Sequence, residues 1–95
     1  MKILILASAK PDLRWFKQYY MRVFPAGRES ADHQFKSLLQ LLKSNPDVGE
    51  RVDGVPFVRE FPIRKTPFTV LYRVQSEHIE ILRVFDQRSE FANAN

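Results

Sequence analysis

The chain has 95 residues, 44% of them hydrophobic, and it contains no cysteine. This length fits one domain with its own core, residues 1–95, and the lack of cysteine excludes disulfides and thiolate chemistry. The formal net charge of +4, with a sequence pI near 9.7, favours an acidic protein or a nucleic acid as partner. No apolar run reaches the length of a secretory signal or a membrane span, so we expect a cytoplasmic protein without membrane contact.

The first elements are predicted to be a buried strand and a helix. Residues 3–6 are a continuous run of Ile and Leu, which is typical of a strand buried on both faces. Ser8 can then cap a helix that has Pro11 and Asp12 in its first turn. Apolar side chains repeat along this helix at helical spacing; they are Leu13, Phe16, Tyr20 and Phe24. The segment Pro25-Ala26-Gly27 is expected to end it.

The same helix carries a second aromatic pair, Trp15 and Tyr19, one helical turn apart. Helical spacing makes these residues core or interface residues before it makes them a platform for stacking bases. If they are exposed, we expect them to mark the docking site of a partner segment.

A second helix is predicted for residues 28–44. Its apolar residues fall at i, i+3, i+4 and i+7; they are Phe35, Leu38, Leu39 and Leu42. Asn45-Pro46 should end the helix, because proline disfavours a helical conformation in the residue before it. The two helices therefore form a hairpin directly after the first strand.

A polar loop over 47–54 is followed by three predicted strands, 55–63, 68–75 and 79–85. The links between them are short, which favours an antiparallel meander. Pro56 and Pro62 share a parity, so both missing N–H groups lie on one side of the first of these strands. That side is expected to be an edge or to be paired only between the prolines. The predicted fold is α+β with order β-α-α-β-β-β and the helices on one face of a small sheet.

Strand parity predicts which residues face the helices. One set comprises Val55, Phe57, Phe61, Ile63, Phe68, Val70, Tyr72 and Val74. The opposite, open face is predicted to carry Val58, Glu60, Arg64, Thr69, Leu71 and Arg73. The last strand has competing patterns. Arg59 shares the parity of the helix-facing set, so it either extends past the helix ends or pairs with an acid such as Asp86.

Arginines recur along these strands and just beyond them, and a strand that only builds a core does not need guanidinium groups. Each one taken singly is best explained as solvated or paired with an acid such as Glu80 or Glu90. As a group we predict a partner-binding surface formed by Arg64, Arg73, Arg83 and Arg88.

The sequence offers little for other chemistry. His33 and His78 lie in different elements without metal-ligand spacing, so no metal site is expected. A Ser76, His78 and Asp86 triad can be written down, but nothing supports its geometry. No phosphate-binding loop and no cofactor are expected.

Three phrases in order resemble the RelE/ParE superfamily of toxins from type II toxin–antitoxin modules. The first is Leu42, Asn45, Pro46 and Gly49 at the end of a helix, and the second is Tyr72-Arg73-Val74 in a strand. The third is the basic phrase that starts at Arg83 in the last strand. The similarity covers almost the whole chain and implies the same β-α-α-β-β-β fold.

The chain departs from the ribonuclease branch of that superfamily at the positions that carry catalysis. Glu60 and Pro62 stand where that branch has lysines, and Thr69 stands for a strand arginine. Asp86 replaces a histidine, and Phe91 replaces the C-terminal tyrosine. The resemblance therefore implies the ParE-like branch, whose members lack these residues and are implicated in poisoning DNA gyrase.

The resemblance leads to two expectations. The favoured one is a toxin that binds a cellular target, with Arg64, Arg73, Arg83 and Arg88 as target contacts. A cognate antitoxin would neutralise it in a hetero-oligomer by covering Trp15 and Tyr19 or the open sheet face. The alternative is a RelE-like ribosome-dependent mRNA endonuclease using Arg64, Arg73 and Arg88, for which the sequence offers no convincing base.

A third interpretation is a non-toxic relative that survives as a binding module. Residues 89–95 are expected to be frayed or partly helical.

Overall fold

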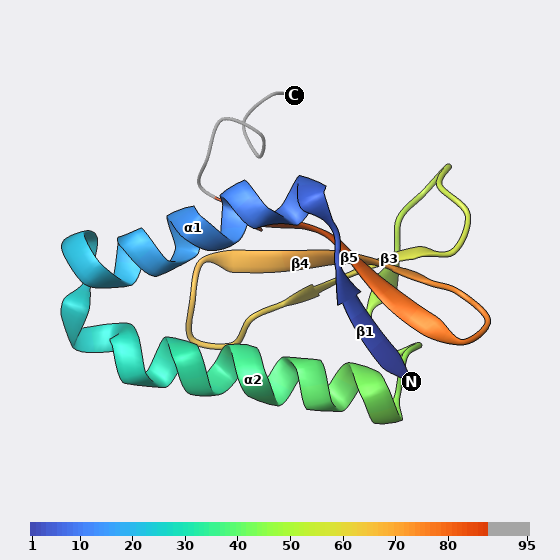
Figure 1. Cartoon of the computed structure of the whole chain (residues 1–95), viewed down its shortest axis with the longest axis horizontal. Coiled ribbons are helices and arrows are strands. Elements are labelled where there is room, and N and C mark those ends of the chain that lie inside the picture. The colour runs from blue at the N-terminus through green and yellow to red at the C-terminus, as the bar shows by residue number, and fades with distance from the viewer. Residues whose placement is uncertain (88–95) are drawn as a thin grey trace.

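The computed structural model describes residues 1–87 and shows two helices packed against a five-stranded sheet (Figure 1). The elements are β1 (Lys2–Ile5), α1 (Lys10–Gln18), α2 (Arg28–Ser44), β2 (Glu50–Arg51), β3 (Val58–Pro62), β4 (Phe68–Val74) and β5 (His78–Asp86). The sheet order is β1-β5-β4-β3-β2. β1 runs parallel to β5, and the other neighbouring pairs are antiparallel. The predicted α+β architecture is confirmed, with β2 as an added strand inside the segment predicted to be a loop.

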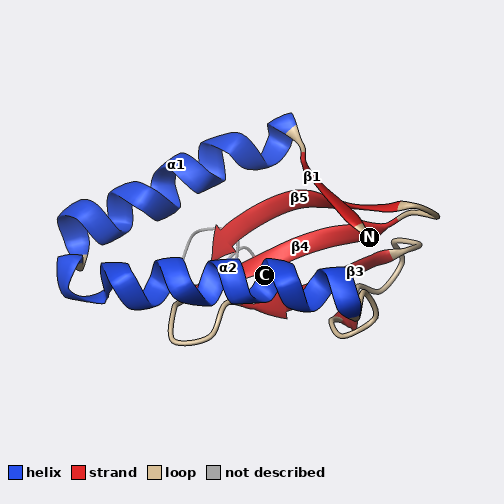
Figure 2. Cartoon of the chain, turned by 60° about the horizontal axis from the view of Figure 1, so that its bottom comes forward, coloured by secondary structure: helices blue, strands red, loops and turns tan. Residues whose placement is uncertain are grey.

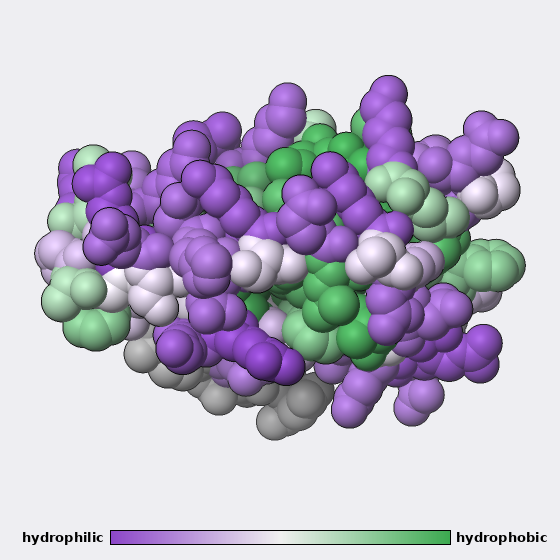
Figure 3. Space-filling model, turned by 90° about the horizontal axis from the view of Figure 1, so that it is seen from below, coloured by the Kyte–Doolittle hydropathy of each residue, from purple (hydrophilic) through white to green (hydrophobic). Residues whose placement is uncertain are grey.

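The core lies between the helices and one face of the sheet (Figure 2). The helical side consists of Phe16 of α1, Tyr20 just after α1, and Leu38 and Leu42 of α2. The sheet supplies Phe68, Val70, Tyr72, Ile79, Ile81 and Val84, all at most 1% exposed. Each such large side chain contributes roughly 2 kcal/mol on burial. Seen from below, the outer surface is largely hydrophilic, with hydrophobic patches between the polar side chains (Figure 3).

The start of α1 differs from the prediction. Ser8 does not cap the helix; it lies in a 3-10 turn, Ala7–Ala9, and its hydroxyl donates to the Leu82 carbonyl at 2.8 Å. The reason is that β1 ends at Ile5, so the carbonyl on the adjoining part of the β5 edge is available to Ser8. Pro11 and Asp12 occupy the first turn of α1 as predicted.

The helical hairpin turns through a π-helical segment, Tyr19–Val23, and a 3-10 turn, Pro25–Gly27. The Phe24 N–H donates to the Tyr19 carbonyl at 2.9 Å, a wider loop than an α-helix makes. This shift takes Phe24 off the predicted apolar stripe and leaves it 50% exposed. The predicted bounds of the second helix are confirmed at both ends.

Of the two prolines predicted for this strand, Pro62 is the last residue of β3, and Pro56 lies in the turn before it. β2 pairs with β3 only at Glu60 and Arg59, between Pro56 and Pro62. The Ile63 N–H, one residue beyond Pro62, donates to the Phe68 carbonyl on the other side of the strand. The missing N–H of Pro62 therefore limits the outer ladder at one end, and the turn before Val58 limits it at the other.

Parity correctly places β4 but fails at the start of the predicted strand 55–63. Val55 and Phe57 do not face the helices; they lie in a loop and are 48% and 74% exposed. Two turns close this loop, with hydrogen bonds from Val55 N to Val52 O and from Val58 N to Val55 O. Gly54 and Phe57 have positive φ values of 79° and 65°, which an extended strand does not allow.

A β-bulge resolves the competing patterns in β5. Leu71 pairs with Arg83 and Tyr72 pairs with Ile81, so Leu82 is the extra residue. Ile81 before the bulge and Val84 after it therefore both face the core. A two-residue period cannot describe such a strand.

No helix within residues 1–87 is both long and apolar enough to cross a membrane. The predictions for Arg88, Glu90 and Phe91 and for the segment 89–95 lie outside the described residues.

Candidate functional site

On the open face of the sheet, Arg73 is held by Glu80 on the neighbouring strand. Its Nε and Nη2 lie 2.7 and 2.6 Å from Glu80 Oε1. Gln75 also donates to this carboxylate, and His78 Nε2 lies 3.2 Å from its other oxygen. The hydrogen bond from Arg73 is the first cause that lowers the pKa of Glu80, followed by those from His78 and Gln75. A carboxylate stabilised as an anion in this way is a poor proton acceptor.

Arg83 is tied to the start of α1. Its Nε and Nη2 donate to the two carboxylate oxygens of Asp12 at 2.6 and 3.1 Å, and the Val84 N–H donates to the same carboxylate. The hydrogen bond to Asp12 raises the pKa of Arg83 above its usual value. The bulge at Leu82 explains this placement, because it shifts the register of the residues that follow it in β5 and so sets the position of Arg83. Arg83 therefore joins two elements.

Arg64, which strand parity assigned to the open face of the sheet, lies in the turn after β3, because β3 ends at Pro62. It is exposed and borders a groove of about 280 Å³ between α2 and β3, beside Leu38, Leu41 and Phe61. Within the described part of the chain Arg64 makes no ion pair. The structure thus places Arg64 in a turn and gives Arg73 and Arg83, on the neighbouring strands β4 and β5, different acidic partners. Arg88 lies beyond the described residues.

Trp15 and Tyr19 contact each other on the hairpin. Their rings meet edge to face with centroids 6.2 Å apart; Trp15 is 47% exposed and Tyr19 packs partly against the core. The π-helical segment carries two further exposed apolar residues, for which the sequence analysis predicted no binding role. Met21 and Val23 are each 59% exposed. Val23 continues the spacing of Trp15 and Tyr19 by four residues, and this signal was present in the sequence.

Arg59 is explained by the loop after α2. Its side chain extends past the helix end, donates to the Gly49 carbonyl at 2.8 Å and the Asp47 carbonyl at 3.2 Å, and lies 3.7 Å from the Asp47 carboxylate. Of the two expected arrangements, extension past the helix is confirmed. The acid is Asp47, and the expected partner Asp86 was wrong.

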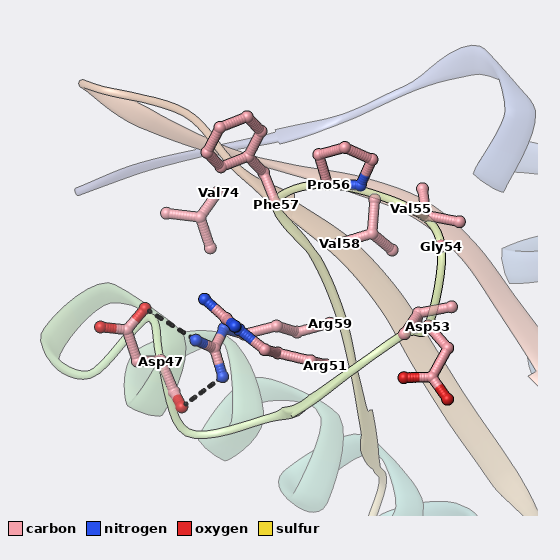
Figure 4. A pocket seen from close by; sticks show the side chains of 11 residues that line it. Asp47, Arg51, Asp53, Gly54, Val55, Pro56, Phe57, Val58, Arg59 and Val74 are labelled. Carbon is pink, nitrogen blue, oxygen red and sulfur yellow. Dashed lines mark hydrogen bonds and ion pairs between the residues drawn. The ribbon is translucent and has the colours of Figure 1, made fainter.

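Beside Arg59 lies a groove of about 730 Å³ that the sequence analysis did not identify (Figure 4). Arg51 and Arg59 form one wall, and Val55, Pro56 and Phe57 line the other. The signal in the sequence is the Val-Pro-Phe-Val run after Gly54, which resembles a strand by alternation and hides a turn. The groove combines guanidinium groups with exposed apolar side chains.

Two of the phrases identified in the sequence meet at one buried hydroxyl. Tyr72 Oη donates to the Pro46 carbonyl at 2.8 Å and accepts from the Gly49 N–H at 2.9 Å. Burial raises the pKa of this phenol. A Cβ on Gly49 would lie 2.6 Å from the Glu60 carbonyl oxygen and 2.7 Å from Tyr72 Oη, so only glycine fits. These residues fix the chain between α2 and β2.

The described residues contain no cluster of three or more His, Cys, Asp or Glu side chains arranged for a metal ion. Within them the open face carries Glu60 opposite Leu71 and the Arg73–Glu80 pair. These surfaces are suited to binding a partner: they present the exposed Trp15, a basic and apolar groove, and the exposed Arg64.

A solved structure of a ParDE system contains a chain with the same fold. The chain is similar in structure to a chain of the "Chromosomal ParDE TA system from P. aeruginosa", with a TM-score of 0.69 and 24% sequence identity. The match covers 90% of this chain and 95% of that one. No curated protein sequence matches.

The family follows from the sequence itself. Residues 3–91 match the model of the family described as the ParE toxin of the type II toxin–antitoxin system, parDE. Because this match covers nearly the whole chain, the protein belongs to the ParE toxin family. The predicted resemblance is thereby confirmed.

Proposed function

We propose that the protein inhibits growth by binding a cellular protein, with DNA gyrase as the target that the ParE-like branch suggests. The observation that carries this proposal is the state of the open sheet face. Its arginine, Arg73, is bound by Glu80, and Glu60 adds a second carboxylate that repels phosphate. A surface that cleaves RNA needs excess positive charge and a proton acceptor.

Arg64 remains the proposed target contact from the predicted set that has no ion pair within residues 1–87. It is exposed at the edge of a groove with apolar walls. Arg73 and Arg83 would act on a target through the carboxylates that hold them, as positioned pairs and not as free cations. Arg88 is proposed from the sequence alone.

An antitoxin is proposed to cover Trp15 and Tyr19. Trp15 is 47% exposed, and the segment that follows α1 adds the exposed apolar residue Val23. An exposed aromatic side chain of this kind is a typical anchor for a partner helix. We expect Trp15→Ala to weaken antitoxin binding at least tenfold, about the effect of losing one aromatic anchor. Gln18→Ala, an exposed change on the same helix, serves as the control and leaves affinity unchanged.

Induced expression in a bacterial host tests the proposal. The expected result is growth arrest with intact transcripts and altered supercoiling of a reporter plasmid, relieved by the antitoxin. Transcripts cut during translation would establish the endonuclease instead. Normal growth at full soluble expression would support the non-toxic binding module.

A further inference from the structure

The groove beside Arg59 lies at the opposite end of the long axis from the turn between α1 and α2; its loop is yellow-green in Figure 1. It is therefore separate from the turn end of the surface proposed for the antitoxin. Its two walls differ in chemistry: guanidinium groups on one side and apolar side chains on the other (Figure 4).

The basic wall carries a charge conflict. Arg51 and Arg59 are direct cross-strand partners, and like charges in that relation destabilise a ladder. Arg59 is compensated by Asp47 and by two carbonyls. Arg51 has no ion pair among residues 1–87, and the Asp53 carboxylate points away from both guanidinium groups (Figure 4). One further carboxylate placed here would resolve the conflict.

The apolar wall is exposed at a cost to the fold. Val55-Pro56-Phe57-Val58 forms a turn with proline at the second position and a positive φ of 65° at Phe57, the third. Glycine is the residue that such a turn prefers there. Phe57 is instead a large side chain that is 74% exposed and lies outside the core cluster. Its ring therefore buries little surface within the fold, which is typical of a side chain that contacts a partner.

We propose that this groove docks an acidic, apolar segment of the protein on which the toxin acts. A carboxylate of that segment lies between Arg51 and Arg59, and a neighbouring apolar side chain packs against Phe57 and Val55. A single carboxylate fits better than a run of phosphates, because the described residues that line the groove include two arginines and Asp47 already pairs with one of them. That the docked segment belongs to the target protein rests on the proposed function; the binding of an acidic, apolar segment does not.

The test is a titration of the ¹⁵N-labelled protein with a short capped peptide of alternating glutamate and leucine, followed by NMR. We expect shifts in the backbone amides of Arg51, Phe57 and Val74, which line the groove. Arg51→Gln should weaken binding about tenfold, since it removes a charge-assisted hydrogen bond. Phe57→Gly should weaken it as well and leave the spectrum of the core unchanged.

Three results would overturn the proposal. In the first, a matched peptide with glutamine in place of glutamate binds equally well. In the second, the NMR shifts are confined to other surfaces or are absent up to millimolar peptide. In the third, a single-stranded oligonucleotide binds more strongly than the peptide. Arg14→Gln, an exposed charge change on α1, is the control and should bind like the wild type. If the protein binds the peptide but does not arrest growth, the proposed function is contradicted and the binding site in the groove is still supported.

Discussion

Two neighbouring segments, 45–49 and 52–57, are separated by the two-residue strand β2 and are built in opposite ways. In the first, Tyr72 accepts from Gly49 and donates to Pro46, and Arg59 donates to the Gly49 carbonyl. In the second, Phe57 is 74% exposed in a left-handed conformation, and Arg51 beside it has no ion pair among residues 1–87. The segment with recognisable sequence phrases stabilises the fold, and the segment without them offers groups for binding.

The largest expected effect is that of Gly49→Ala, which tests the tightness of the first segment. The added Cβ meets a backbone oxygen and the Tyr72 hydroxyl below 3 Å, in a buried site that cannot relax cheaply. We expect the free energy of unfolding to fall by about 3 kcal/mol in urea denaturation. Gly54→Ala is the matched control: it has open space and a φ of 79°, so it should cost only about 1 kcal/mol. Equal losses at the two glycines would refute the contrast.

Tyr72→Phe is expected to cost about 2 kcal/mol, because it leaves the buried Gly49 N–H and the Pro46 carbonyl without their partner. The hydroxyl also predicts a pH dependence. Burial raises the pKa of Tyr72 in the folded state, so its stability contribution is complete below the ordinary tyrosine pKa of about 10 and is lost as pH rises beyond it. Unfolding midpoints measured from neutral to alkaline pH should fall less steeply in the variant.

Glu80→Gln tests the ion pair on the open face. The pKa of Glu80 is lowered in the folded state, so its contribution is present above the ordinary glutamate pKa, about 4.3, and is lost as pH falls below it. The wild type should therefore lose stability in acid, and the variant should show a flatter profile over that range. A variant with the same acid dependence as the wild type would show that the Arg73–Glu80 pair contributes nothing measurable.

The smallest effect is expected for Phe57→Gly. Glycine relieves the left-handed strain at φ 65° but adds freedom to the unfolded chain, so the two terms largely cancel. We expect unfolding free energy within about 1 kcal/mol of the wild type, in the stabilising direction. A loss comparable to that of Tyr72→Phe would mean that Phe57 supports the fold, and the distinction between the two segments would fail.

Sequence patterns predicted those parts of the fold that depend on local spacing. The bounds of α2 followed from the helical period, and the end of the β2–β3 pairing at Pro62 followed from proline chemistry. Sequence patterns failed where a single residue changes the alternation of a strand. The extra residue at Leu82 and the positive φ at Phe57 each break a strict alternation, and neither has a signal that periodicity can detect.

The candidate site was predicted less well than the fold, for an electrostatic reason. Arg73 and Arg83 were identified by residue type, but their acids, Glu80 and Asp12, come close only in the folded chain. Whether an arginine is free depends on such contacts. Arg51, which has no ion pair among the described residues, carried no signal beyond its charge.

The central claim is that target binding depends on groups that the fold leaves unsatisfied, with Arg51 foremost. The most direct measurement is growth arrest after induction of Arg51→Gln and Arg14→Gln, two exposed changes with the same loss of charge, at matched soluble levels and matched urea midpoints. The account predicts that Arg51→Gln no longer arrests growth and that Arg14→Gln arrests it like the wild type. Full toxicity of a folded Arg51→Gln variant would contradict it.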